Sequence, residues 1–162
     1  MGGIVVGVDG SAPSREALRW AVEEARIRGT LVEAVYVYEH TPSWQLYGYA
    51  ESLGAIDTAS LDVDAERAER EAAARAEQLV EGELAQIGEL GDVQVETVVL
   101  EERRPARALV ERSRTADMLV VGTRGRGGFA GLLLGSVSHQ CSQHAVCPVV
   151  IVGEPDAGED VD

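Results

Sequence analysis

Residues 118–125 read Met-Leu-Val-Val-Gly-Thr-Arg-Gly, a run of four apolar residues that ends in a glycine. The apolar run predicts a buried strand over residues 118–121. A glycine-rich segment, residues 122–135, follows this strand and leads into a helix predicted over residues 136–145. Residues 148–152 (Pro-Val-Val-Ile-Val) then predict another strand. A strand, a turn, a helix and a strand in this order indicate one unit of a parallel α/β sheet.

The same alternation extends back to the N-terminus. Strands are predicted at residues 4–8, 31–38 and 93–100, and helices at residues 13–28, 60–90 and 105–114. Five short β-branched strands separated by helices imply a parallel sheet with helices on both faces. Right-handed crossovers make this fold a doubly wound, Rossmann-like α/β sandwich, in which ligands bind at the carboxyl ends of the strands. We therefore expect function at two turns, Asp9-Gly10-Ser11 and residues 122–135.

Length and charge limit the domain count and the partners. The chain has 162 residues, which is about one domain, and its formal net charge is −14. A nucleic-acid or anionic-membrane surface needs a basic face, so we expect neither partner. We expect a folded domain over residues 1–153 and a disordered acidic tail over residues 154–162. The aromatic loop at residues 39–58 could stack on a bound base or pack on the sheet, and packing is preferred.

The basic residues and the cysteines narrow the kinds of binding site and the cellular compartment. All 14 basic residues are arginine, and the absence of lysine excludes a Walker A loop and a pyridoxal Schiff base. The sequence contains no apolar run long enough for a membrane span. Cys141 and Cys147 are the only cysteines, which fits a reducing compartment, and we expect a cytoplasmic protein. His139 and His144 do not share a helix face, so no metal site is predicted.

The segment 122–135 is the candidate phosphate site. Glycines permit a backbone concavity of N–H groups, and the helix that begins at Gly135-Ser136 presents unpaired N–H groups and a positive dipole to an anion. Arg124 and Arg126 add positive charge to an otherwise acidic chain. On the residues alone, a glycine loop with Ser136 as an ordinary helix cap explains the pattern equally well.

Four segments together resemble the universal stress protein family: Val5-Val6-Gly7-Val8-Asp9-Gly10-Ser11, residues 116–125 (ADMLVVGTRG), residues 134–138 (LGSVS) and residues 147–152 (CPVVIV). The ATP-binding branch of that family is marked by Gly, two residues, Gly, nine residues, Gly and Ser or Thr. Gly122, Gly125, Gly135 and Ser136 meet this spacing without a gap.

The resemblance implies the strand order 3-2-1-4-5, which places the first and fourth strands side by side. It also implies that Asp9 contacts adenosine and that the backbone at Val37 contacts adenine. The ligand it implies is ATP, with or without Mg²⁺. The candidate binding residues are therefore Asp9, Gly10, Ser11, Val37, Gly122, Thr123, Arg124, Gly125, Gly135, Ser136 and Val137.

Three functions remain open at this point. The preferred one is an ATP-binding stress-response regulator with slow or no hydrolysis, because no convincing catalytic base is visible and no catalytic residue is assigned. The alternatives are a weak ATPase or phosphotransferase and a nucleotide-free dimeric scaffold. A homodimer is expected through residues 149–152, because an apolar edge strand pairs or aggregates unless it is protected.

Overall fold

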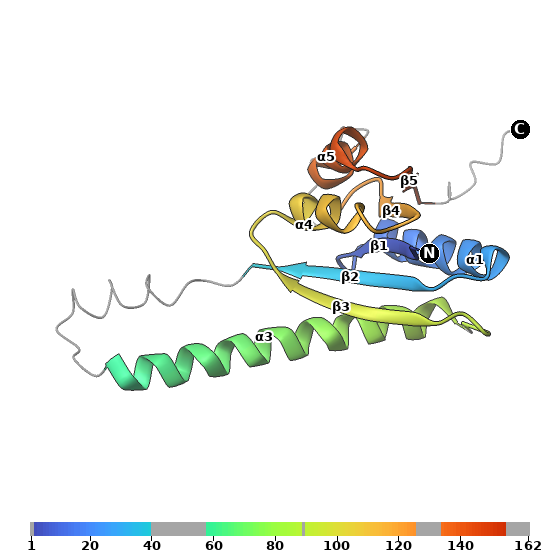
Figure 1. The fold of residues 1–162 in the computed structure, drawn as a ribbon. Helices are drawn as coiled ribbons and strands as arrows, with labels where there is room; N and C mark the ends of the chain where they lie inside the picture. The colour runs from blue at the N-terminus through green and yellow to red at the C-terminus, as the bar shows by residue number, and fades with distance from the viewer. Residues whose placement is uncertain (1, 40–57, 89, 126–133, 155–162) are drawn as a thin grey trace, which may run out of the picture.

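The computed structural model describes residues 2–39, 58–88, 90–125 and 134–154. Strands and helices alternate along these residues (Figure 1), in the order β1 Ile4–Val8, α1 Ala12–Arg28, β2 Val32–Tyr38, α3 Thr58–Ile87, β3 Val95–Glu101, α4 Pro105–Arg112, β4 Met118–Gly122, α5 Ser136–His144 and β5 Val149–Val152. The aromatic loop and most of the acidic tail lie outside the described residues. The described residues contain no helix long and apolar enough to cross a membrane.

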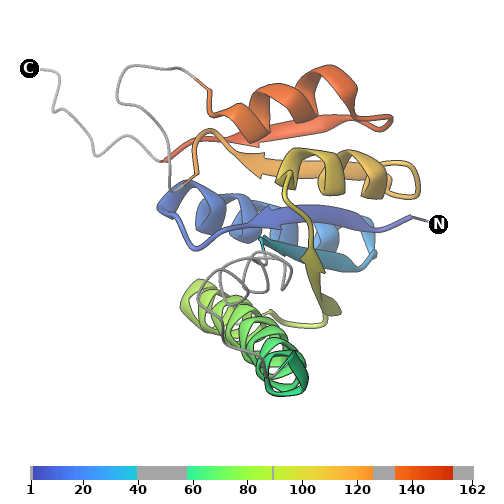
Figure 2. The same cartoon turned by 90° about the vertical axis from the view of Figure 1, so that its left-hand side faces the viewer.

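The five strands form one sheet in the order β3-β2-β1-β4-β5 (Figure 2), and all four neighbouring pairs are parallel. This confirms the doubly wound α/β fold and the implied strand order. Ile4 of β1 lies in register with Val32 of β2 on one side and with Met118 of β4 on the other. The carboxyl ends of β1 and β4 therefore lie next to each other.

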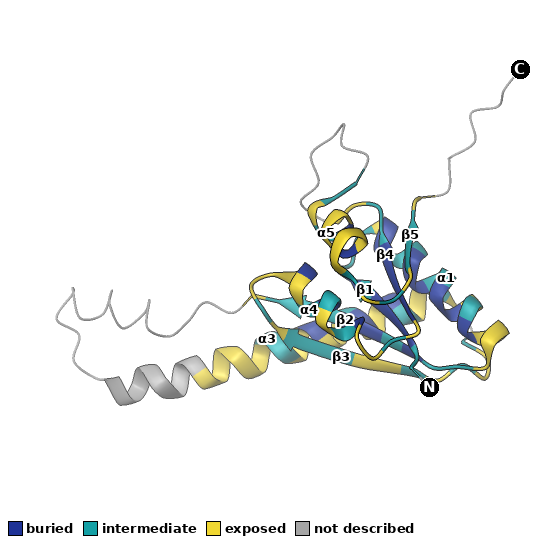
Figure 3. Ribbon diagram, turned by 45° about the horizontal axis from the view of Figure 1, so that its top comes forward, coloured by how far each residue is buried: buried dark blue, intermediate teal, exposed yellow. Residues whose placement is uncertain are grey.

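Alternation along β1 divides the core between the two faces of the sheet. Ile4, Val6 and Val8 pack with buried residues of α1 and α3, whereas Val5 packs on the opposite face with residues of α4 and α5. Residues of a strand point alternately to opposite faces, and both faces of this strand are apolar because helices cover both. Figure 3 shows the buried residues concentrated in the central strands and in α1.

Helix α1 has clear start and stop signals. The Ser11 hydroxyl accepts a hydrogen bond from the Ser14 amide at 3.3 Å, and Pro13 occupies the first turn, where its missing N–H costs nothing. Gly29 ends the helix in the left-handed conformation with φ of 64°. The cap fixes the start of α1 directly after the end of β1.

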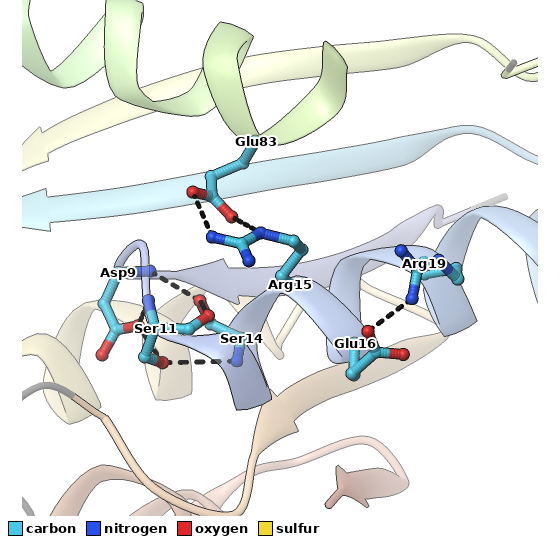
Figure 4. Close-up of polar contacts among 7 residues, drawn as sticks. All are labelled: Asp9, Ser11, Ser14, Arg15, Glu16, Arg19 and Glu83. Atoms are coloured by element: carbon cyan, nitrogen blue, oxygen red, sulfur yellow. Dashed lines mark hydrogen bonds and ion pairs between the residues drawn. The ribbon is translucent and has the colours of Figure 1, made fainter. Parts of the chain in front are cut away.

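Helix α3 contains 30 residues and extends beyond the sheet (Figures 1 and 3). Ala76, Val80 and Glu83 are buried, whereas residues 66–71 are exposed. The Glu83 carboxylate accepts two hydrogen bonds from the Arg15 guanidinium, at 2.7 and 3.1 Å (Figure 4). This pair ties the C-terminal half of α3 to the first turn of α1.

Candidate functional site

Asp9 follows the last residue of β1 and is held by the turn that leads into α1. Its Oδ1 atom accepts hydrogen bonds from the Ser11 amide at 2.9 Å and from the Ser11 hydroxyl at 2.6 Å (Figure 4). Gly10 has a φ of 78°, a conformation that favours glycine over other residues. The expected turn Asp9-Gly10-Ser11 is thus formed, and its two hydrogen bonds position the carboxylate.

Gly122 ends β4 and lies against the first turn of α1. A Cβ atom at this position would lie 2.7 Å from the carbonyl carbon of Pro13 and 2.9 Å from its Cβ. Glycine is therefore required by the close approach of two backbones. The role of Pro13 as the neighbour of Gly122 was not predicted from the sequence.

Gly125 lies beside the carboxylate of Asp9. A Cβ atom at Gly125 would collide with Asp9 Oδ2, and the Ser11 hydroxyl lies 3.4 Å from the carbonyl oxygen of Arg124. The turn after β1 and the segment after β4 therefore meet, as expected at the switch point of the sheet. Asp9, Ser11, Arg124 and Gly125 form one surface region, in which Arg124 and Gly125 are exposed.

The peptide groups of Thr123 connect three elements. The Thr123 amide donates to the carbonyl oxygen of Val152 at 2.8 Å, and the Thr123 carbonyl oxygen accepts from the Gly135 amide at 2.7 Å. The Ser138 hydroxyl donates to the same carbonyl oxygen at 3.0 Å. The amides of Thr123 and Gly135 are therefore used within the protein, so these two residues shape the segment and do not offer backbone donors to an anion.

The start of α5 offers backbone donors instead. The amides of Ser136, Val137 and Ser138 belong to the first turn of a helix, where N–H groups have no partner within the helix. The N-cap residue, Gly135, has no side chain to cap them, and no acceptor for them is found in residues 2–39, 58–88, 90–125 and 134–154. Ser136 is exposed, so its hydroxyl is accessible. This end of α5 can bind an anion through amides, a hydroxyl and the helix dipole.

Val37 lies one residue beyond the last position at which β1 pairs with β2, which is Val8 with Tyr36. On its other side Val37 is in register with Leu100 of β3. The backbone of β2 at Val37 therefore continues past the point where the chain leaves β1 at Asp9. This places Val37 at the same carboxyl edge of the sheet as Asp9.

Glu102 and Arg103, in the segment between β3 and α4, engage neighbouring protein groups. The Arg103 guanidinium lies 3.2 Å from the Glu39 carboxylate, and Glu102 accepts a hydrogen bond from the Arg104 amide at 3.2 Å. Arg103 therefore neutralises Glu39 at the end of β2. The described cation on the glycine-rich segment is Arg124, since Arg126 lies outside the described residues.

The two thiols have raised pKa values. Burial raises the pKa of Cys141 to about 11, which keeps this thiol protonated and unreactive at neutral pH. Burial also raises the pKa of Cys147. Among the described residues, no group of three or more His, Cys, Asp or Glu side chains could hold a metal ion.

The model of the universal stress protein family matches residues 1–153. The chain belongs to the universal stress protein family. A universal stress protein of Mycolicibacterium smegmatis is 36% identical over 160 residues, which are 98% of this chain and 50% of that protein. This member of the family thus spans half the length of a curated relative that it matches.

Solved structures show the same fold. A universal stress protein in complex with cAMP has a TM-score of 0.61 at 23% identity, covering 95% of this chain and 98% of that chain. A universal stress protein from Archaeoglobus fulgidus in complex with dAMP has a TM-score of 0.53 at 21% identity, covering 94% and 98%. Adenine nucleotides are thus the ligands in two proteins that share this fold.

Proposed function

We propose that this universal stress protein binds an adenine nucleotide at the carboxyl edge of β1 and β4 and acts as a nucleotide-dependent regulator of the stress response. The observation that carries the proposal is the meeting of three groups: the Asp9 carboxylate, the segment Gly122–Gly125 and the first-turn amides of α5. The cAMP and dAMP complexes of structural neighbours support the same class of ligand.

The two ends of the site suit the two ends of a nucleotide. The first-turn amides of α5, the Ser136 hydroxyl and Arg124 would hold phosphate, because all of them favour negative charge. Asp9 can accept hydrogen bonds from ribose hydroxyls or from the adenine amino group, but it would repel phosphate. The backbone at Val37 would contact the adenine. Gly10 and Ser11 would position Asp9, and Thr123 and Gly135 would shape the phosphate-binding segment.

ATP is the proposed ligand, and nucleoside monophosphates are the second candidate because of the cAMP and dAMP complexes. Within the described residues the protein offers no cluster of metal ligands, so a Mg²⁺ ion would be held mainly by the phosphates.

The homodimer is proposed through residues 149–152 of β5, the outer strand of the sheet. Two free thiols are consistent with a cytoplasmic location.

Mass spectrometry of the ligand released from freshly purified, denatured protein tests the proposal. Bound ATP, ADP, AMP or cAMP identifies the nucleotide, and calorimetric titration of ligand-free protein then measures its affinity. We expect Asp9→Ala to lower the affinity by tenfold or more, since a charge-assisted hydrogen bond contributes about 1.5–3 kcal/mol. The exposed carboxylate variant Glu66→Ala, on α3, is the matched control and should bind like the wild type.

Two outcomes would contradict the proposal. The absence of any thermal shift or titration heat with all four nucleotides would favour a nucleotide-free scaffold. Product formation from ATP well above that of Ser136→Ala would favour an ATP-consuming enzyme. The same purified protein serves both measurements, so the three functions are distinguished in one series.

A further inference from the structure

Ser138 is a buried serine on the first turn of α5, with 2% of its surface exposed. Its hydroxyl lies 3.0 Å from the carbonyl oxygen of Thr123 and 3.0 Å from that of Gly135. Thr123 follows β4 and Gly135 precedes α5, so the hydroxyl bridges the two ends of the glycine-rich segment. A hydroxyl carries one proton, which these two acceptors share.

We propose that Ser138 is a positioning residue for phosphate. By bridging the carbonyl oxygens of Thr123 and Gly135, its hydroxyl fixes the direction of the amides at the start of α5. The proposal rests on the proposed nucleotide-binding function and adds a side chain whose hydroxyl is bonded to the protein backbone and acts through the amides beside it. The Gly135 amide donates to Thr123 at 2.7 Å, and the Ser138 hydroxyl is the second bond across the same gap. Without the hydroxyl, the bond from the Gly135 amide to Thr123 would be, among the described residues, the hydrogen bond that remains between the two ends.

Glycine at position 135 is part of the same arrangement. A Cβ atom there would lie 3.3 Å from Cα of Arg124 and 3.5 Å from the carbonyl oxygen of Thr123. The two segments are therefore in backbone contact, and small changes at their junction alter where the amides of Ser136 and Val137 point. Phosphate affinity depends on that direction, because several amides must converge on one anion.

Two other serines show that this role is specific to Ser138. The Ser142 hydroxyl of α5 also donates to the carbonyl oxygen three residues earlier, at His139, but Ser142 is exposed and this bond stays within α5. The Ser113 hydroxyl is buried, donates to Val110 and accepts from the Val146 amide, away from the site. Ser142→Ala is therefore the control for the loss of a serine hydroxyl on α5. Ser113→Ala is the control for the loss of a buried hydroxyl.

The test compares ATP with adenosine, which lacks the phosphates. We expect Ser138→Ala to weaken ATP binding by about fivefold to tenfold, the effect of one net hydrogen bond. Adenosine should bind within about twofold of the wild-type affinity, because one backbone bond still holds Gly135 to Thr123. Ser138→Thr keeps the hydroxyl and should recover most of the ATP affinity. Ser142→Ala and Ser113→Ala should bind ATP like the wild type.

The outcomes separate this inference from the proposed function. Equal ATP affinity in Ser138→Ala and wild type would overturn the inference, and so would an equal loss for ATP and adenosine, which indicates a general structural role. If the wild type binds no nucleotide, the proposed function fails, and hydrogen exchange of the Gly135 amide in the ligand-free protein decides the bridging role. Faster exchange in Ser138→Ala than in Ser142→Ala supports it, and unchanged exchange overturns it.

Discussion

Gly125 and Asp9, from segments that follow different strands, are in such close contact that a Cβ atom at Gly125 would overlap Asp9 Oδ2. The contact follows from the strand order, because β1 and β4 are neighbours and parallel. The neighbouring Gly122 is equally restricted, but by the backbone of Pro13 instead of a side chain. The two glycines therefore respond differently to the same substitution.

Gly125→Ala should impair binding more than stability. Asp9 and Ser11 are partly exposed, so water can replace their hydrogen bonds when the Asp9 carboxylate rotates away from an added methyl group, and we expect the free energy of unfolding to change by less than about 1 kcal/mol. The rotation withdraws Asp9 from its contact with Ser11, and nucleotide affinity should fall by about tenfold, as for a lost charge-assisted bond. Urea unfolding and calorimetric titration measure the two quantities. Wild-type affinity in this variant would contradict the placement of Asp9 in the site.

Gly122→Ala should impair stability. The added methyl group meets the Pro13 backbone, which cannot rotate aside, and overpacking of this kind costs about 1–3 kcal/mol. Gly82→Ala is the matched control, because a Cβ atom at Gly82, an exposed residue of α3, meets nothing within 4 Å. It should stabilise the protein by about 0.5–1 kcal/mol through the helix propensity of alanine. If urea unfolding gives Gly122→Ala a free energy of unfolding equal to or greater than that of Gly82→Ala, this difference is contradicted.

Local patterns predict the fold well because each strand is short, apolar and bounded by a turn signal. The predicted strand at residues 93–100 is observed at Val95–Glu101, and the helix at residues 60–90 is observed at Thr58–Ile87. Such small shifts arise because the ends of elements depend on tertiary contacts. The helix caps Ser11 and Gly29 are local signals and are observed at α1.

The candidate site is only partly predictable from its motif. The spacing of Gly122, Gly125 and Gly135 does not show that the amides of Thr123 and Gly135 donate within the protein, since their acceptors belong to other elements. Ser138 was missed for the same reason: its partners become visible only in the fold. A weak signal existed, because Ser138 lies three residues before Cys141, another buried residue of α5, so it occupies the apolar face of the helix.

The open edge of β5 gives a prediction about the proposed dimer. Leu119 donates to the carbonyl oxygen of Pro148, and Thr123 donates to that of Val152. In a parallel strand the backbone groups alternate in direction, so Val150 faces β4 whereas Val149 and Ile151 face the open edge. Ile151→Pro removes an outward N–H and should give a monomer by size-exclusion chromatography with light scattering.

Two related variants control for loss of folding. Val150→Pro breaks the hydrogen bonding between β4 and β5 and should unfold the strand or precipitate the protein. Ile151→Val keeps the outward N–H and should elute like the wild type. A wild-type monomer, or a dimer of unchanged mass in Ile151→Pro, would refute the interface.

The pair Arg15 and Glu83 should show unequal effects of its two single substitutions. Glu83 has 8% of its side chain exposed and Arg15 has 28%, so loss of the arginine leaves a buried carboxylate without its partner. We expect Arg15→Met to cost about 3 kcal/mol and Glu83→Gln about 1 kcal/mol in urea unfolding. Arg70→Ala, which removes an exposed pair with Glu66, should cost less than about 0.5 kcal/mol. Equal costs for Arg15→Met and Glu83→Gln would contradict the asymmetry.

Cys141 predicts a loss of stability at alkaline pH. Burial raises the pKa of the Cys141 thiol from its ordinary value of 9.0 to about 11, and the unfolded chain has the ordinary value. Between these values the unfolded state loses the thiol proton first, so stability is retained below about pH 9 and declines as the pH rises. The decline is about 2 kcal/mol at pH 11 and approaches about 3 kcal/mol, the equivalent of two pKa units, above it. Urea unfolding under reducing conditions at pH 8 and pH 11 measures the decline. Cys141→Ala removes the titrating group and should decline less over this range, whereas an identical decline in both proteins would contradict the assignment.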